Sequence, residues 1–294
     1  MIVFDSKASL VDKIYNLSTS MLFNGRKNKM QRKTYFNCAE QEFLNENCNY
    51  DAKETVFLSF DIDWVPDYML NFTADLVSHL DVSFMHTHAS PVCAEIAKHF
   101  SSGIHPNLQK NSDQGETIDD SIKFLSNLGV SFETCRFHVL NYGYPDLIKL
   151  SERGTKLDSS TILFNGKNII PTYHHDLDMI LAPYFWEDGI YLRGKDLRGS
   201  QNMIDWETRG LKIFDFHPLD IYLNTSSMSQ RNIFKKSVKK LQDTEEKFSR
   251  PFINNTVNSG SRDVLLDLIS KEKKGEITIK SLATLNNEFR ELML

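Results

Sequence analysis

The chain has 294 residues, of which 40% are hydrophobic and 25% are charged. These proportions are ordinary for a globular protein and exclude a disordered, collagen-like or disulfide-scaffold chain. The formal net charge is -5, so the sequence lacks the overall basic character expected of a nucleic-acid-binding protein.

The first fifty residues are polar and mixed in character. Residues 8–22 have apolar side chains at roughly helical spacing and predict one amphipathic helix, followed by a basic, Asn-rich loop over 24–33. Residues 1–10 contain Asp5 and lack the apolar run of a secretory signal. No apolar stretch approaches the roughly 20 residues that cross a bilayer. We therefore expect a cytoplasmic protein in which residues 1–50 form an N-terminal extension packed on the domain that follows.

Strands and helices alternate from Thr55 onward. The run 55–64 is apolar, β-branched and aromatic, and it predicts a buried strand. Further segments have strand or helix patterns: strands within 81–91, 102–104, 135–140, 157–163, 181–189 and 211–219, and helices over 67–79, 92–100, 117–128 and 144–154. Repeated βαβ units favour a barrel-like α/β fold. The charged amphipathic segments 228–248 and 261–294 predict peripheral helices.

Asp61 and Asp63 give the strongest local signal for chemistry. Alternate residues of a strand point to the same side, so both carboxylates share one face at the strand end, which carries the active site in α/β barrels. Two carboxylates crowded there repel each other unless a cation or a proton separates them. The other interpretation is a pair of surface acids that cap a turn. It is less favoured, because Phe57, Leu58 and Phe60 just upstream predict burial.

Histidines follow the next predicted strands. His86 and His88 have the same i, i+2 spacing as the two acids, which suits a transition metal such as Zn²⁺. His105 stands where the following strand ends. Taken singly, each histidine is better explained as a structural side chain. Together with the acids at the preceding strand end, they indicate a metal site.

Two later segments offer a cation and a further imidazole. Arg136 and His138 share one face of a predicted strand, where the guanidinium can fix the ionisation and orientation of a catalytic carboxylate. His217 ends another apolar run, where it can act as a general acid.

Other polar and aromatic segments have two interpretations each. His174 lies within 173–176, which we interpret as the wall of a loop in preference to a pair of ligands. The stretch 186–188 forms the floor of a sugar pocket or merely closes a turn. The candidate substrate contacts are side chains near predicted strand ends: His86, His138, His174, Trp186, Glu187 and Asp188.

In order and spacing these stretches resemble the NodB-homology polysaccharide deacetylases (carbohydrate esterase family four), and more narrowly the WbmS-like branch associated with O-antigen and surface-glycan biosynthesis. The matching stretches are SFDIDW (59–64), HTHASP (86–91), GIHPN (103–107), RFH (136–138), LDSS (157–160), FWEDG (185–189), FHPLDIYLN (216–224) and GSRD (260–263). Each is short, but the ordered set is specific. The resemblance implies a distorted or incomplete (β/α) barrel over 51–227, followed by a helical segment over 228–294.

For catalysis, the resemblance implies a base, an acid and a bracing arginine. Asp61 matches the base, Arg136 the arginine that braces it, and His217 the general acid. These roles imply a metal-dependent hydrolase that removes an N-acetyl group from an amino sugar of a surface glycan, or from its lipid- or nucleotide-linked precursor. The alternatives are another C–N hydrolase on the same barrel and an inactive relative that binds glycans.

For the metal, the resemblance implies a divalent cation, usually zinc, with Asp63 and His105 as ligands. The family places a second histidine four residues after the first, where this chain has Gln109. We therefore expect His88 to supply the missing ligand, with His86 as the second choice. The sugar, the metal and the oligomeric state are not specified by the sequence.

Overall fold

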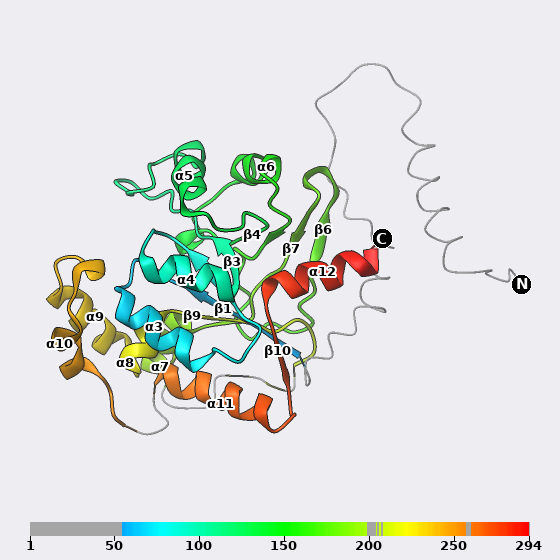
Figure 1. The fold of residues 1–294 in the computed structure, drawn as a ribbon. Helices are drawn as coiled ribbons and strands as arrows, with labels where there is room; N and C mark the ends of the chain where they lie inside the picture. The colour runs from blue at the N-terminus through cyan, green and yellow to red at the C-terminus, as the bar shows by residue number, and fades with distance from the viewer. Residues whose placement is uncertain (1–54, 199–203, 205, 207, 257–259, 294) are drawn as a thin grey trace, which may run out of the picture. The chain divides into compact units, whose positions relative to one another are not determined.

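The computed structural model describes residues 55–198, 204, 206, 208–256 and 260–293 (Figure 1). The predicted extension over residues 1–50, including its helix over 8–22, lies outside the described residues. Within them, a curled and mostly parallel sheet carries helices on its outside. This arrangement confirms the predicted α/β fold of the distorted (β/α) barrel type.

The central strand of the sheet is β1 (Thr55–Asp61), which is buried from Val56 onward. A strand covered on both faces needs apolar side chains in consecutive positions, which explains the sequence pattern. β1 lies between β2 (Ser83–His86) and β9 (Ile213–Phe216), and its first residues also pair with β10 (Thr278–Lys280). All of these pairings are parallel, so the carboxyl ends of β1, β2 and β9 meet at one edge of the sheet.

The remaining strands extend the sheet on both sides. Beyond β2 come β3 (Ser101–Ile104), β4 (Thr134–Cys135), β5 (Leu157–Asp158), β7 (Met179–Leu181) and β6 (Thr172–His174), and beyond β9 comes β8 (Trp186–Glu187). The β6–β7 pairing is antiparallel. Among the described residues, β6 and β8 end the strand path without pairing to each other, so the barrel is incomplete.

Ten helices accompany these strands in the described part of the chain. They are α3 (Asp67–Leu76), α4 (Pro91–His99), α5 (Ile118–Leu125), α6 (Tyr144–Glu152), α7 (Asp188–Arg198), α8 (Pro218–Leu223), α9 (Met228–Ser237), α10 (Glu246–Ser249), α11 (Ser261–Lys273) and α12 (Leu282–Met293). Thr117 caps α5, because its side chain accepts a hydrogen bond from the Asp120 backbone N–H. No helix described here is both long and apolar enough to span a bilayer.

Two secondary-structure expectations are corrected. The strand predicted over 135–140 ends at Cys135, because the Phe137 N–H donates to Ser160 Oγ (2.8 Å) and the His138 N–H to the Pro106 carbonyl (2.8 Å) in place of a strand ladder. Residues 138–140 then form a 3-10 turn. The second correction is β10, which lies within a segment that we expected to be helical throughout.

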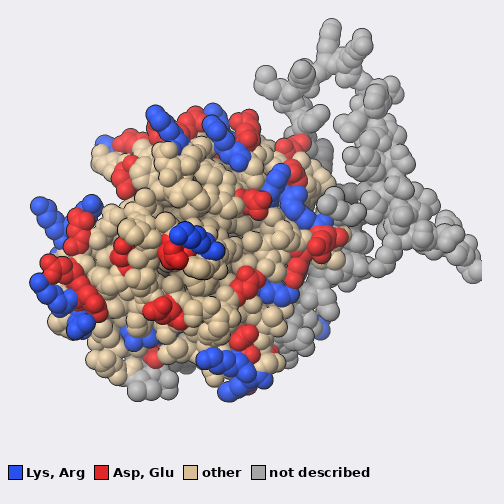
Figure 2. Space-filling view, in the orientation of Figure 1, with Lys and Arg blue, Asp and Glu red and all other residues tan. Residues whose placement is uncertain are grey.

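Charged side chains of both signs are interspersed over the face drawn in Figure 2. No extended basic patch is visible on the described part of that face. The mixture agrees with the modest net charge of -5.

Candidate active site

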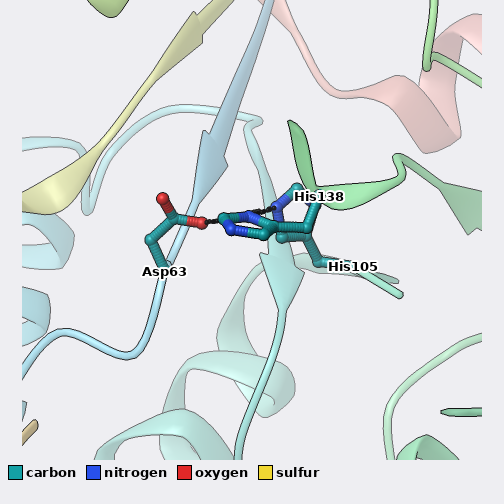
Figure 3. Close-up of side chains that lie close together, drawn as sticks. All are labelled: Asp63, His105 and His138. Carbon is teal, nitrogen blue, oxygen red and sulfur yellow. Dashed lines mark hydrogen bonds and ion pairs between the residues drawn. The ribbon is translucent and has the colours of Figure 1, made fainter. Parts of the chain in front are cut away.

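Asp63, His105 and His138 converge at the carboxyl edge of the sheet (Figure 3). Asp63 Oδ1 lies 3.0 Å from His138 Nδ1 and 3.4 Å from His105 Nε2, and the two ring nitrogens are 3.1 Å apart. The structure thus brings together Asp63 and His105, as the sequence analysis expected. It adds His138, which we had assigned to substrate binding.

Three strand ends deliver these side chains. Asp63 follows β1, His105 follows β3, and His138 lies in the turn after β4. The backbone is left-handed at Asp63 (φ 40°) and Trp64 (φ 54°), conformations that cost about 1–3 kcal/mol each in residues other than glycine. The Trp64 N–H donates to Thr87 Oγ1 (3.2 Å), and its indole N–H to Asp113 (2.8 Å), which helps to hold this bend.

The cluster fits a divalent metal. Asp63 Oδ1 is buried and makes no hydrogen bond, although two imidazole nitrogens lie close to it. A carboxylate oxygen and two imidazole nitrogens are the donors that zinc takes in catalytic sites. A bound cation would satisfy Asp63 Oδ1 and both imidazole nitrogens at once, in place of the hydrogen bond between His105 Nε2 and His138 Nδ1 (3.1 Å).

Asp61 and Asp215 share one guanidinium beside this cluster. Arg136 Nη1 donates to Asp61 Oδ1 (2.9 Å) and to Asp215 Oδ1, and its Nε donates to the Ser159 carbonyl (2.9 Å). Ser59 Oγ also donates to Asp215 Oδ1 (3.1 Å). Arg136 is fully buried, so its orientation is fixed by these partners.

The shared guanidinium acts differently on the two acids. Burial alone would raise the pKa of Asp61, but Arg136, followed by His105 and His217, outweighs it and holds that pKa below its usual value. At Asp215 burial dominates, and the pKa is raised well above its usual value. Arg136 therefore favours the ionised form of Asp61.

Replacing Arg136 by Met should destabilise the fold strongly. Removing one partner of a buried ion pair leaves the other charge uncompensated, which typically costs about 3–5 kcal/mol. Urea denaturation followed by circular dichroism measures the free energy of unfolding. Arg250→Met is the control, because the Arg250–Glu246 pair lies on the surface and should contribute nothing measurable. Equal effects of the two substitutions would contradict the role given to Arg136.

His217 is held by Asp188. His217 Nδ1 lies 2.7 Å from Asp188 Oδ1, and its backbone N–H donates to Asp188 Oδ2 (2.8 Å). The other ring nitrogen, Nε2, lies 3.5 Å from Asp63 Oδ2. Burial would lower the pKa of His217, but Asp188 and Asp63 outweigh it and raise that pKa well above its usual value. The two carboxylates therefore favour the protonated form of His217, at the edge of the cluster.

The sequence analysis missed Asp215 and the positioning role of Asp188. A signal for Asp215 was present, because Asp215 and His217 repeat the i, i+2 spacing of Asp61 and Asp63 on a neighbouring strand. The two strands are in parallel register, with Ser59 opposite Asp215, so the side chains at both strand ends face the same region.

His88 and His86 do not join the cluster, contrary to our expectation for the third ligand. Asp61 is in register with Met85, so His86 points to the opposite side of the sheet, where its Nε2 lies 3.3 Å from Ser102 Oγ. His88 follows the strand, and its ring nitrogens face Thr87 Oγ1 (2.9 Å) and Cys93 Sγ (3.9 Å). Neither ring is therefore available to a metal held by Asp63.

The buried His86 predicts sensitivity to acid. Burial, followed by the neighbouring His88, lowers the pKa of His86 from 6.5 to about 4. Between these values the unfolded chain binds the proton and the folded chain does not, so stability falls as the pH drops from about 6.5 to about 4. The decrease in the free energy of unfolding that His86 causes over this pH range should approach about 3 kcal/mol.

Urea denaturation at several pH values tests this. His86→Asn should flatten the pH dependence, whereas His99→Asn, at an exposed histidine of α4, should leave it unchanged. An unchanged slope in His86→Asn would contradict the prediction.

Three other candidate substrate contacts are buried side chains. Trp186 is fully buried and packs against Phe216, with ring centroids 4.8 Å apart, so it belongs to the core. Asp188 is also fully buried, and both of its oxygens bind His217. His174 is buried on β6 against Tyr144. Two of the expected contacts are hence core or positioning residues, and the third packs under another ring.

Glu187 remains at the site. Glu187 is only partly buried. Its carboxylate lies near Asp188 and His217, and the possible ligand atoms of these three residues are within 4.8 Å of one another. Burial, opposed by His217, raises the pKa of Glu187. It therefore stays a candidate for substrate contact.

Comparisons with known proteins give one family and one solved structure. The WbmS-like polysaccharide deacetylase family matches residues 58–235. A crystal structure of a putative polysaccharide deacetylase involved in O-antigen biosynthesis, from Bordetella bronchiseptica, superposes with a TM-score of 0.63 at 24% sequence identity, covering 74% of this chain and 90% of that one. This likeness shows the fold. No curated protein is significantly similar in sequence.

Proposed function

The chain belongs to the WbmS-like polysaccharide deacetylase family, and from this membership and the geometry of its site we propose that it is a metal-dependent hydrolase that removes an N-acetyl group from an amino sugar. The observation that supports this most is the grouping of the Asp61 carboxylate with the His217 imidazole, whose possible ligand atoms lie within 4.8 Å of each other, next to the Asp63 carboxylate. Charged neighbours lower the pKa of Asp61 and raise that of His217. Amide hydrolysis needs both a base and an acid of this kind.

Asp63, His105 and His138 would hold the metal, and zinc suits their donor atoms best. A divalent cation bound there would supply Lewis-acid polarisation of the acyl carbonyl. Because Gln109 occupies the family's usual position for the second histidine and is exposed, His138 takes that place in our proposal.

Asp61 would take a proton from the attacking water. Its carboxylate is kept ionised by Arg136, and its Oδ2 lies 3.7 Å from His105 Nε2, which sets it beside the cluster. The water oxygen then bonds to the acyl carbon. Arg136 holds the carboxylate in one orientation through Oδ1 and leaves Oδ2 to receive the proton.

His217 would protonate the departing nitrogen as the C–N bond breaks. Asp188 fixes Nδ1, so Nε2 is the nitrogen that carries the transferable proton. The products are acetate and a free amine. One water is consumed: its hydroxyl becomes part of acetic acid, which loses its proton to give acetate. The amine receives its proton from His217, and the proton that Asp61 took from the water restores the protonated His217, directly or through solvent.

We propose an amino sugar of a surface glycan, or of its lipid- or nucleotide-linked precursor, as the substrate. Support comes from the family and from the O-antigen role ascribed to the Bordetella protein. A cytoplasmic location stays a prediction from the sequence.

Acetate release from N-acetylated sugars by the zinc-loaded protein tests the proposed reaction. Asp61→Asn should lower kcat by about 10²- to 10⁴-fold, since it removes the general base but keeps the shape of the side chain. No acetate from any such sugar, or an unchanged rate in Asp61→Asn, would contradict the proposal. Opening of a cyclic amide without acetate release would instead support the alternative C–N hydrolase.

A further inference from the structure

Helix α9 is fixed against the segment that carries His217. Arg231 Nε lies 3.1 Å from Asp220 Oδ2, and both side chains are buried. Asp220 lies in α8, which begins directly after His217. The face of α9 that carries Arg231 is consequently turned toward the candidate active site.

A second contact links the same face of α9 to β8 and α7. A Cβ atom added at Gly189 would lie 2.6 Å from Glu187 Oε1 and 2.8 Å from Arg231 Nη1. The carboxylate and the guanidinium thus converge on the residue next to Asp188, which holds His217. Among the described residues, Arg231 therefore has one ion-pair partner, Asp220.

Lys235 stands one helical turn after Arg231, on the same face of α9. It is exposed, and no ion pair to it is found among the described residues. Surrounding protein and Arg231 lower the pKa of Lys235, whereas Asp63 and Asp220 oppose that change. Lys235 therefore lies on the face of α9 that Arg231 turns toward Asp220, without an ion-pair partner among the described residues.

The unpaired ammonium group of Lys235 can bind an anionic group of a ligand. Asp220 is already matched by Arg231, and a metal held by Asp63 would neutralise that carboxylate. Once the metal is bound, Lys235 therefore offers a positive charge that no protein group in the described part of the chain compensates. A compact ammonium on a flexible stem suits a carboxylate or a phosphate.

We propose that Lys235 binds an anionic substituent, a carboxylate or a phosphate, on the acylated sugar, so that the protein selects acidic N-acetylated sugars over neutral ones. The inference rests on the proposed function in placing an N-acetylated sugar at the Asp63 cluster. It deepens that function by specifying that the substrate is negatively charged and by naming the side chain that binds the charged substituent.

Isothermal titration calorimetry on the zinc-loaded full-length chain tests the inference by binding alone. The probes are N-acetylglucosamine, which is neutral, N-acetylglucosamine 1-phosphate, and the N-acetylated sugar with a C6 carboxylate. At least one acidic probe should bind about tenfold more tightly than the neutral sugar, as a charge-assisted contact allows. Whichever acidic probe gains affinity identifies the source of the negative charge.

Lys235→Gln should abolish that preference, whereas Lys236→Gln should retain it, because Lys236 is also exposed but points to another side of the helix. Equal binding of acidic and neutral probes, including no detectable binding of any, would overturn the inference. So would equal losses in both variants. If the preference depends on Lys235 but no acetate is ever released, the anion subsite stands and the proposed hydrolysis fails.

Discussion

Replacing His138 by Ala should lower the affinity of the protein for Zn²⁺ by at least about 100-fold. Mutating a residue that only hydrogen-bonds to a metal ligand typically lowers metal affinity by about 10- to 100-fold. Removing a direct ligand should lower it at least as much. His138 Nδ1 lies 3.0 Å from Asp63 Oδ1, and Gln109, which stands at the family's usual position, is exposed. Competition with a chromogenic chelator measures the dissociation constant without any substrate.

His88→Ala is the matched control for that experiment. Both substitutions remove one imidazole, but His88 faces Thr87 and Cys93 in place of the cluster. The zinc affinity of His88→Ala should remain within about threefold of that of the wild-type protein. This change is smaller than the loss expected from mutating a residue that orients a metal ligand. A large loss in His88→Ala with little loss in His138→Ala would reverse our assignment of the third ligand.

Asp188→Asn should reduce kcat for acetate release by about 10³-fold or more. The carboxylate binds both the ring and the backbone of His217 and keeps the imidazole protonated. An amide of the same shape removes the charge that stabilises the imidazolium and can select the wrong tautomer, which costs on the order of 10⁴-fold in serine proteases.

Zinc affinity should stay nearly unchanged in Asp188→Asn, which separates a positioning role from loss of the metal site. Asp119→Asn, at an exposed acid of α5, is the control for the substitution itself and should keep full activity. A kcat within tenfold of the unchanged enzyme would show that His217 does not depend on Asp188 as the geometry indicates.

The fold and part of the site followed from local patterns. The apolar run ending at Asp61 has the pattern of a strand buried on both faces, and parallel strands bring their carboxyl ends to one edge. That reasoning expected the acids and histidines at successive strand ends to form a metal site. The choice of Asp63 and His105 as ligands came from the resemblance, and the two side chains do lie together although they are far apart in the sequence. The base, the acid and the bracing arginine came from the resemblance, and their side chains do meet at that edge.

The third donor could not be found in this way. A strand pattern over 135–140 fixes only which face His138 would share with Arg136, whereas the chain leaves the sheet after Cys135 and turns the imidazole toward Asp63. The hydrogen bonds that end β4 come from residues distant in sequence, including Ser160. For His86, the sequence correctly predicted that alternate residues share one face of the strand, but not which face of the sheet His86 occupies. That face depends on the register between β2 and β1.

X-ray diffraction at the zinc absorption edge from zinc-soaked crystals tests the central claim most directly. We predict an anomalous peak about 2.0–2.2 Å from an Asp63 carboxylate oxygen, His105 Nε2 and His138 Nδ1. A zinc peak at His88 and Cys93, with none at the Asp63 cluster, would contradict it.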